Sequence, residues 1–230
     1  MKLDALRAQV CQANRDLVEH GLVTLSWGNV SGLSESREHV VIKPSGIPFE
    51  TMQSAQMVVV DLEGNVVEGD LKPSSDLATH LLLYRHLEGI GGVTHTHSPY
   101  ATTFAEARVE IPCRGTTHAD HFGGPVPVTR LLTAEEVDQA YEANTGRVII
   151  ERFAAIDPRE IPAVLVAGHG PFTWGKDAAD SVKNAVALEA VAGSALRGRI
   201  IRPDAPLLED YVLRKHHQRK HGPDAYYGQR

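Results

Sequence analysis

The chain has 230 residues and a mass of 25.0 kDa, with 42% hydrophobic and 23% charged residues. This composition is that of an ordinary globular protein with a full core, and it excludes a disordered chain and a small disulfide-stabilised domain. The formal net charge of −6 argues against a general nucleic-acid binder, because phosphates are neutralised by a clustered excess of Lys and Arg. The exception is a basic, histidine-rich run over residues 214–221.

Nothing in the sequence marks a domain boundary or a targeting signal. We expect one domain over residues 1–230, because no linker, charge block or low-complexity tract interrupts the chain. Cys11 and Cys113 make no disulfide framework and read as reduced thiols. The N-terminus is charged, and no run approaches the ~20 apolar residues of a membrane span. These features predict a cytoplasmic protein with no membrane partner.

Periodicity predicts an alternation of helices and strands through the first hundred residues. Apolar side chains three and four residues apart indicate amphipathic helices, and short β-branched runs indicate strands. Gly64 supplies the positive φ of a hairpin, so the early strands are partly antiparallel. The cluster Ser74-Ser75-Asp76 has the composition of an N-cap. In chain order we expect a helix over 4–20, strands over 39–43, 57–61 and 65–68, a helix starting near 75, and a strand over 93–97.

The second half of the chain is predicted from a capping box, one apolar strand and two long helices. Thr133 and Glu136 form the capping box of a helix that extends to about Glu142. In chain order we expect helices over 100–107 and 133–142, a short strand at best over 126–129, a buried strand over 162–167, and helices over 177–196 and 207–220. The tally predicts an α/β domain with a central mixed sheet and helices on both faces.

Three histidines are the sharpest chemical signal. His95 and His97 are two residues apart in a predicted strand, so both imidazoles point to one side and can bind one metal ion. His169 follows the other apolar strand, between two glycines, where sites gather in open α/β sheets. Three neutral imidazoles leave a fourth position open, as in a catalytic metal site. Alone, the His95–His97 pair is equally typical of a structural or surface position, and Asp76 suits either a metal ligand or an N-cap.

A second set of residues suits a phosphate. Pro44-Ser45-Gly46 follows a strand, Ser74 and Ser75 lie at a helix N-terminus, and Lys43 adds positive charge. Hydroxyls and free backbone amides of this kind bind phosphate, although each segment is also an ordinary turn or cap. Neither glycine pattern of the common nucleotide-binding sites is present, which disfavours a nucleotide.

Two further candidates lie in segments with little apolar content. Asp120 ends the small-residue segment that begins at Gly115, which we expect to be an exposed loop. A carboxylate there is normally solvated, but beside a metal it can move protons. Tyr227 lies near the end of the chain, where its phenol needs a neighbouring cation to act as an acid or base. A disordered tail is the alternative for this last segment.

Jointly, these motifs resemble a known family. From end to end the chain is similar to the class II aldolase family, also called the aldolase II/adducin head family, and within it to the L-ribulose-5-phosphate 4-epimerase family. The resemblance is specific because the motifs occur together. It rests on residues 24–31, 42–46, 72–76, 95–98, 115–120, 169–172, 219–222 and 225–229. The visible departure is the additional Arg230 at the end of the chain.

The resemblance implies a fold, an assembly and a metal site. The fold is a single α/β domain with three α/β/α layers and a central, mainly antiparallel sheet, assembled as a homotetramer with each site at a subunit interface. One Zn²⁺ per subunit, or another divalent metal in its place, is held by His95, His97 and His169, with Asp76 as the nearby carboxylate ligand. The substrate, chiefly its phosphate, is bound by Gly28, Asn29, Ser45, Gly46, Ser74 and Ser75, with Lys43, His216 and Arg219 as further residues that reach the site.

The implied reaction interconverts L-ribulose 5-phosphate and D-xylulose 5-phosphate by zinc-assisted retro-aldol cleavage and re-formation of the C3–C4 bond. Asp120 and Tyr227 match the family's acid/base pair, drawn partly from a neighbouring subunit, and the sequence does not assign the direction in which each acts. The pathway stays open among L-arabinose, L-xylulose-derived and ascorbate catabolism.

Three alternatives to the epimerase remain. One is a class II sugar-phosphate aldolase that releases its aldehyde fragment, and another is a non-enzymatic, adducin-like assembly module. The most distant is nucleic-acid binding by the basic C-terminal run, whose histidines and arginines already have a role in the site. The aldolase is disfavoured because aldolase relatives carry Glu where this chain has Asp76. The intact set of metal ligands argues against the assembly module.

Overall fold

The computed structural model of the chain describes residues 3–227. Gly228 and Gln229, which complete the C-terminal motif, and the additional Arg230 lie outside the described residues. Cys11 and Cys113 are both buried and free, as expected for reduced thiols.

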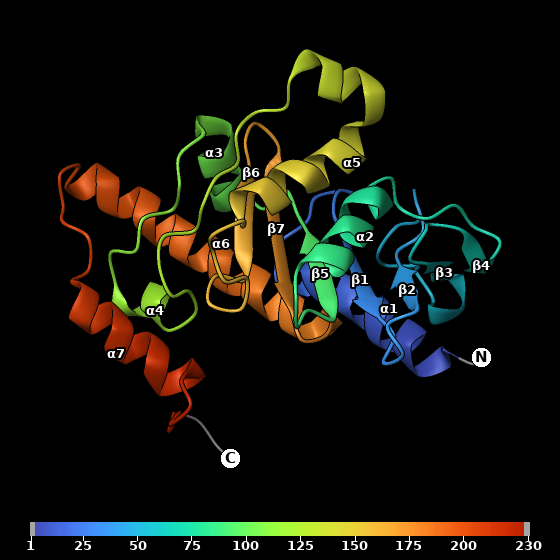
Figure 1. Cartoon of the computed structure of the whole chain (residues 1–230), viewed down its shortest axis with the longest axis horizontal. Helices are drawn as coiled ribbons and strands as arrows, with labels where there is room; N and C mark the ends of the chain where they lie inside the picture. Colours follow the sequence, from blue (N-terminus) through green and yellow to red (C-terminus); the bar gives the residue numbers. More distant parts are fainter. Residues whose placement is uncertain (1–2, 228–230) are drawn as a thin grey trace.

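A seven-stranded sheet forms the middle of the molecule, in the order β4-β3-β2-β1-β5-β7-β6 (Figure 1). All neighbouring strands pair antiparallel. The mixed sheet expected from the residue pattern is therefore wrong. The strands that follow long connections, β5 and β6, also lie beside antiparallel neighbours. The mainly antiparallel sheet implied by the resemblance is confirmed. The strands are β1 (Asn29–Leu33), β2 (His39–Ile42), β3 (Val58–Asp61), β4 (Val66–Glu68), β5 (Gly92–His95), β6 (Ala163–Val166) and β7 (Gly170–Gly175).

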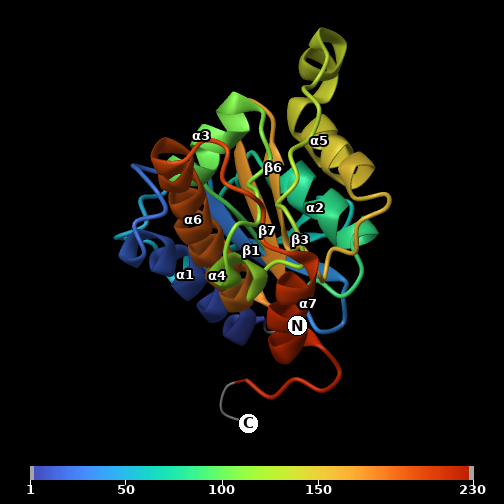
Figure 2. The same ribbon diagram turned by 90° about the vertical axis from the view of Figure 1, so that its left-hand side faces the viewer.

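Helices cover both faces of this sheet and complete the three expected layers (Figure 2). Helices α1, α3 and α6 lie on one face, and α2 and α5 pack together on the other. The short helix α4 contacts α7 beside the sheet. The helices are α1 (Asp4–Glu19), the 3₁₀ turn η1 (Ser54–Gln56), α2 (Leu77–His86), α3 (Pro99–Ala107), α4 (Thr116–Ala119), α5 (Ala134–Arg152), α6 (Ala178–Ile201) and α7 (Asp210–His221).

Alternation along the strands sends side chains into separate cores on the two faces. In β2, Val40 and Ile42 pack in the core beneath α2 and α5, whereas Val41 packs in the core beneath α1. Strand β3 repeats the pattern. Each fully buried side chain of this size contributes about 1.5–3 kcal/mol of transfer free energy. A register shift of one residue would exchange the two faces, so the burial of both fixes the register.

Two strands are absent from the sequence-based prediction. Strand β1 contains Asn29, Ser31 and Gly32, which have low strand propensity, and strand β7 begins with Gly170 and Pro171, which read as a turn. Both strands form because they pair with β5 in the centre of the sheet, where packing overrides local propensity.

Several predicted boundaries also move. Strand β5 ends at His95 rather than at residue 97, and α2 begins at Leu77 rather than near 75. The helix with the Thr133 capping box extends to Arg152 instead of ending near Glu142, because it continues past a break at Ala140. Residues 126–129 form only isolated bridges, which agrees with a short strand at best. The helices expected over 177–196 and 207–220 are α6 and α7.

Substitution of Gly92 tests the close contact between β5 and α6. A Cβ at this position would lie 2.2 Å from the Asp177 carbonyl oxygen, which belongs to the backbone and cannot move aside cheaply. We expect Gly92→Ala to lower the free energy of unfolding by about 3 kcal/mol, as overpacking does. The control is Gly198→Ala, where no atom lies within 4 Å. It should raise stability by about 0.5–1 kcal/mol, because Ala is favoured over Gly inside a helix. Equal stability of the two variants in denaturant unfolding would contradict this account.

Candidate functional site

The end of β5 is the point at which the candidate site is built. Strands β1 and β7 flank β5 and run antiparallel to it, so both begin where β5 ends. The register places Asn29 opposite His95 on one side and Phe172 opposite it on the other. His169 lies immediately before β7, in the turn that joins β6 to β7. The sheet therefore gathers residues that are far apart in the sequence.

Three imidazoles meet at this point. His95, His97 and His169 each offer one ring nitrogen, and these atoms lie within 4.8 Å of one another. His95 Nε2 is 3.1 Å from His97 Nε2, and the ring centroids of the three residues are between 4.7 and 5.1 Å apart. Strand β5 ends at His95, so His97 lies in the turn after the strand. This turn, and not the alternation of side chains along a strand, brings His97 to His95.

His95 is held by two contacts that leave one of its nitrogens free. Its Nδ1 donates to the Pro171 carbonyl oxygen at 2.9 Å, and its ring stacks on Phe172 with the centroids 4.2 Å apart. A carbonyl oxygen can only accept, so Nδ1 carries the proton and Nε2 keeps its lone pair. A hydrogen bond behind the coordinating nitrogen is the common arrangement for metal-binding histidines.

Burial keeps the three imidazoles neutral. Desolvation lowers the pKa of His95 and of His97, and desolvation together with the two neighbouring histidines lowers the pKa of His169 to about 3. Neutral imidazoles have the lone pairs that bind divalent metals. His169 Nδ1 is buried and has no hydrogen-bond partner among the described residues, which fits a group whose partner is an ion. The donor set therefore fits a metal ion.

Asp76 borders the same cavity and is held in place by an amide. It occupies the N-cap position of α2 without making a side-chain cap bond. Asn29 Nδ2 donates to Asp76 Oδ2 at 2.6 Å and to Ser74 Oγ at 3.0 Å. Burial alone would raise the pKa of Asp76, but electrostatic interactions with the His95 and His80 rings and the bond from Asn29 outweigh it and lower the pKa. Asp76 is thus an anion near the histidines, although it is not in the group whose ligand atoms meet.

The two predicted phosphate loops pair with each other. The Ser45 amide donates to the Lys72 carbonyl and the Ser74 amide donates to the Lys43 carbonyl, each at 2.9 Å. These two amides are therefore not free to bind a phosphate, contrary to the expectation from the sequence. The hydroxyls of Ser45 and Ser75 and the ammonium group of Lys43 remain for that role. Burial lowers the pKa of Lys43, and a bound anion would counter that effect.

One cavity of about 620 Å³ joins the histidines and the loops. Gly28 is required there because its φ is +100° and a Cβ would lie 2.8 Å from the His95 carbonyl oxygen. The cavity contains most of the site residues predicted from the sequence. They are Gly28, Asn29, Lys43, Ser45, Gly46, Ser74, Ser75, Asp76, His95, His97 and His169.

Part of the cavity wall consists of residues that the sequence does not predict. Tyr141 and Glu142 line it, and the Tyr141 ring lies 5.9 Å from the His169 ring, measured between centroids. Burial, with the charges of Asp76 and Glu142, raises the pKa of Tyr141, so its hydroxyl keeps its proton. No sequence signal marks these residues, because their position depends on the break in α5 at Ala140.

The remaining predicted residues form a separate cluster between α4 and α7. Arg219 donates to both carboxylate oxygens of Asp120, the shortest distance being 2.8 Å, and His216 Nδ1 donates at 3.0 Å. Burial alone would raise the pKa of Asp120, but the bonds from Arg219 and His216 and the charge of Lys220 lower it. The Tyr227 ring lies 4.8 Å from Arg219 and 4.6 Å from Lys220, so the cations that its chemistry requires are present.

The Asp120 segment is not the exposed loop that the sequence suggested. Residues 116–119 form α4, His118 and Ala119 are buried, and the side chain of Asp120 is only 14% exposed. The reason is that α7, from the far end of the chain, covers it. Asp120 and Tyr227 line a cavity of about 530 Å³ that shares no residue with the histidine cavity. One chain thus does not bring Asp120, Tyr227, His216 and Arg219 to its own histidines.

The histidine cavity is suited to a small anionic ligand rich in oxygen. Neutral imidazoles can hold a Lewis acid, and hydroxyls with an ammonium group can hold a phosphate several ångströms away. The Asp120 cluster offers a carboxylate and a phenol for proton transfer, but from a different surface of the chain.

Comparisons with known proteins agree with this geometry. The sequence profile of the family described as Class II Aldolase and Adducin N-terminal domain matches residues 8–196. Proteins named L-ribulose-5-phosphate 4-epimerase UlaF from Salmonella paratyphi C (strain RKS4594) and from Salmonella typhi are each 54% identical over 228 residues, which cover 99% of this chain and 100% of the relative.

Solved structures give the same fold. The structure titled L-fuculose 1-phosphate aldolase superposes with a TM-score of 0.80 and 25% identity, over 95% of this chain and 97% of that chain. YgbL from Klebsiella pneumoniae, titled a putative aldolase/epimerase/decarboxylase, superposes with a TM-score of 0.73 and 25% identity, over 94% of this chain and 100% of that chain. Among residues 3–227, no helix has the length and apolar character needed to cross a membrane.

Replacement of one histidine tests whether the imidazole group holds a metal. We expect the purified protein to bind a divalent ion and His169→Gln to lower its affinity by more than about 100-fold, because loss of even an outer partner of a ligand costs about 10–100-fold. Calorimetric titration with Zn²⁺ measures this. The matched control is His86→Gln, which changes an exposed histidine on α2 and should leave the affinity unchanged. Equal affinities of the two variants would show that the ion binds elsewhere.

Proposed function

The chain belongs to the class II aldolase and adducin N-terminal domain family, and from this premise we propose that it interconverts L-ribulose 5-phosphate and D-xylulose 5-phosphate. Full-length similarity to relatives named as this epimerase supports the assignment. The structural observation that carries it is the single cavity in which the three-histidine group lies beside Asp76 and the serine and lysine loops. The three-histidine group suits the carbonyl end of a keto-sugar phosphate, and the serine and lysine loops suit its phosphate end.

The chemistry requires cleavage of a carbon–carbon bond. The carbon to be inverted, C4, carries a hydroxyl and no acidic C–H, so deprotonation at carbon cannot invert it. When the C4 hydroxyl loses its proton, the C3–C4 bond breaks, its electron pair stays on the three-carbon fragment, and C4 becomes the aldehyde of glycolaldehyde phosphate. The bond re-forms on the other face of the aldehyde, and the C4 oxygen regains a proton. The sequence balances without an oxidant or reductant.

Each group in the histidine cavity has a part in this reaction. His95, His97 and His169, with Asp76 as the nearby carboxylate, would hold a divalent ion, which would supply a Lewis acid for the negative charge on the three-carbon fragment. Ser45, Ser75 and Lys43 bind the phosphate. This contact keeps the two-carbon aldehyde in the cavity while its carbonyl group rotates to present the other face. Gly28, Gly46 and Asn29 shape the wall, and Asn29 also fixes Asp76 by its hydrogen bond.

We assign the two proton transfers to Asp120 and Tyr227. Because these residues do not line the histidine cavity of their own chain, we propose that they act on the cavity of a neighbouring copy. His216 and Arg219 hold the Asp120 carboxylate in its ionised form. Each site is then shared by two subunits, as expected of an interfacial site, and the resemblance is the ground on which we propose a homotetramer. The direction in which each residue acts is left open.

Zn²⁺ is the proposed ion, because neutral imidazoles suit zinc and leave a position for substrate. We propose that the protein folds as a single catalytic domain over residues 1–230 and works in the cytoplasm, with L-arabinose catabolism among its candidate pathways.

An aldolase is the second candidate function. The observation that favours it is the superposition on the structure titled L-fuculose 1-phosphate aldolase. The two activities share the cleavage step and differ in the fate of the aldehyde, which an epimerase retains and an aldolase releases.

Carbon NMR of the reaction mixture tests the proposed function. Incubation of the purified protein with L-ribulose 5-phosphate should yield D-xylulose 5-phosphate, without free two- or three-carbon products. A chelator should stop the reaction, and added Zn²⁺ should restore it, because the Lewis acid stabilises the charge that cleavage creates. Accumulation of free glycolaldehyde phosphate would assign the protein to the aldolases instead. No reaction of the zinc-loaded protein would contradict both assignments.

A further inference from the structure

Helix α5 is broken immediately before it reaches the histidine cavity. Ala140 has φ −163° and ψ 73°, so residues 134–139 and the part of α5 after the break point in different directions. Tyr141 and Glu142 follow the break and line the cavity. The Tyr141 ring contacts His169, with centroids 5.9 Å apart and ring planes inclined by 45°. The break therefore determines where Tyr141 lies relative to the imidazoles.

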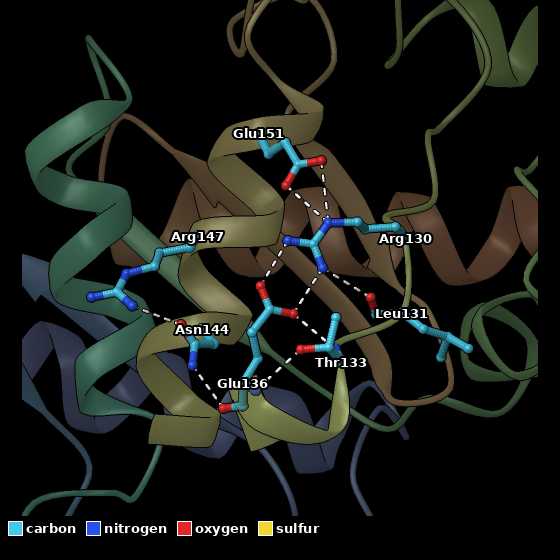
Figure 3. A network of polar contacts seen from close by, with 7 residues as sticks. All are labelled: Arg130, Leu131, Thr133, Glu136, Asn144, Arg147 and Glu151. Atoms are coloured by element: carbon cyan, nitrogen blue, oxygen red, sulfur yellow. Dashed lines mark hydrogen bonds and ion pairs between the residues drawn. The ribbon is translucent and has the colours of Figure 1, made fainter. Parts of the chain in front are cut away.

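A polar network crosses the break (Figure 3). The guanidinium of Arg130 binds Glu136, before the break, through two hydrogen bonds of 2.8 Å, and it binds Glu151, after the break, at 3.0 Å. Glu136 also closes the capping box with Thr133. We call Arg130, Glu136 and Glu151 the α5 brace, because one cation holds both parts of the broken helix.

Asn144 makes a second connection across the same break. Its Nδ2 donates to the Glu136 carbonyl oxygen at 2.7 Å, so the bond joins a residue after the break to one before it. Arg147 in turn donates to Asn144 Oδ1 at 2.7 Å. The Tyr141 carbonyl accepts from Thr145 Oγ1 at 2.9 Å. The conformation at the break is thus specified by side chains and is not a frayed helix end.

We propose that Tyr141 contacts the sugar phosphate in the histidine cavity and that the α5 brace positions it there. The phenol presents an apolar ring face to the carbon chain of the substrate and a hydroxyl donor to its oxygens. Tyr141 is 37% exposed, so it does not serve mainly to fill the core. Arg130, whose side chain is 42% exposed, makes an ion-pair network at the surface, where a single pair contributes little to stability. These two observations fit a Tyr141 that serves the cavity and an α5 brace that positions it from the surface.

Steady-state kinetics with L-ribulose 5-phosphate test Tyr141, and this test rests on the proposed function. Tyr141→Ala should raise KM about tenfold with a much smaller change in kcat, as loss of binding shared by ground and transition states does. Tyr141→Phe separates the ring from the hydroxyl and should have an intermediate KM. Turnover by the unaltered protein with an unchanged KM in Tyr141→Ala would overturn the inference alone. No turnover by the unaltered protein would overturn the proposed function and this inference together.

A double-mutant cycle tests whether the brace acts through Tyr141. Arg130→Gln should raise KM about threefold in the unaltered protein, the size expected for a surface pair, and should have no further effect in the Tyr141→Ala background. Equal effects in both backgrounds would show that the brace does not position Tyr141. Glu151→Gln removes one arm only and replaces Arg130→Gln if the latter does not fold. Arg7→Gln, which breaks the Arg7–Glu68 pair of 3.1 Å between α1 and β4, is the matched control and should leave KM unchanged.

Discussion

The antiparallel pairing of β5 with β1 and β7 is the constraint on which the site depends. Because both neighbours begin where β5 ends, one point in the sheet receives Asn29, His95 and the turn that carries His169. The bond from His95 Nδ1 to the Pro171 carbonyl then orients the ring, so that Nε2 faces the other imidazoles. Burial removes water from these groups and lowers the pKa of His95 and His169, which keeps them neutral. The backbone pairing that forms the centre of the sheet therefore also positions the imidazoles of the site.

Most of the residues that line the histidine cavity could be predicted from the sequence because their signals are local. A His-x-His pair, a histidine between glycines and serines at a helix start have few alternative explanations when they occur in one chain. Strand β7 could not be predicted, since its Gly170 and Pro171 resemble a turn and only pairing with β5 makes them a strand. The break in α5 was equally hidden, because the contacts of Arg130 and Asn144 that cross it leave no trace in the apolar periodicity of the sequence.

Asp120 illustrates the limit of local reasoning most clearly. Its segment is small and polar, which suggests an exposed loop, but Arg219 and His216 bind its carboxylate from α7. The same contacts that hold Asp120 ionised also keep it and Tyr227 on a surface separate from the histidine cavity of the chain. The proposed reaction uses both sets of residues, so we propose that it takes place between two copies of the chain.

Complementation between two inactive variants measures this central claim most directly. His169→Gln removes the metal site and Asp120→Asn removes a proton-transfer group, so each variant alone should be inactive. Co-expression should restore epimerisation, because mixed oligomers contain sites with an intact cavity from one copy and an intact Asp120 from the other. Co-expression of His169→Gln with His97→Gln damages the same cavity twice and should restore nothing. Mixed oligomers of the first pair that remain inactive would contradict a site shared between copies.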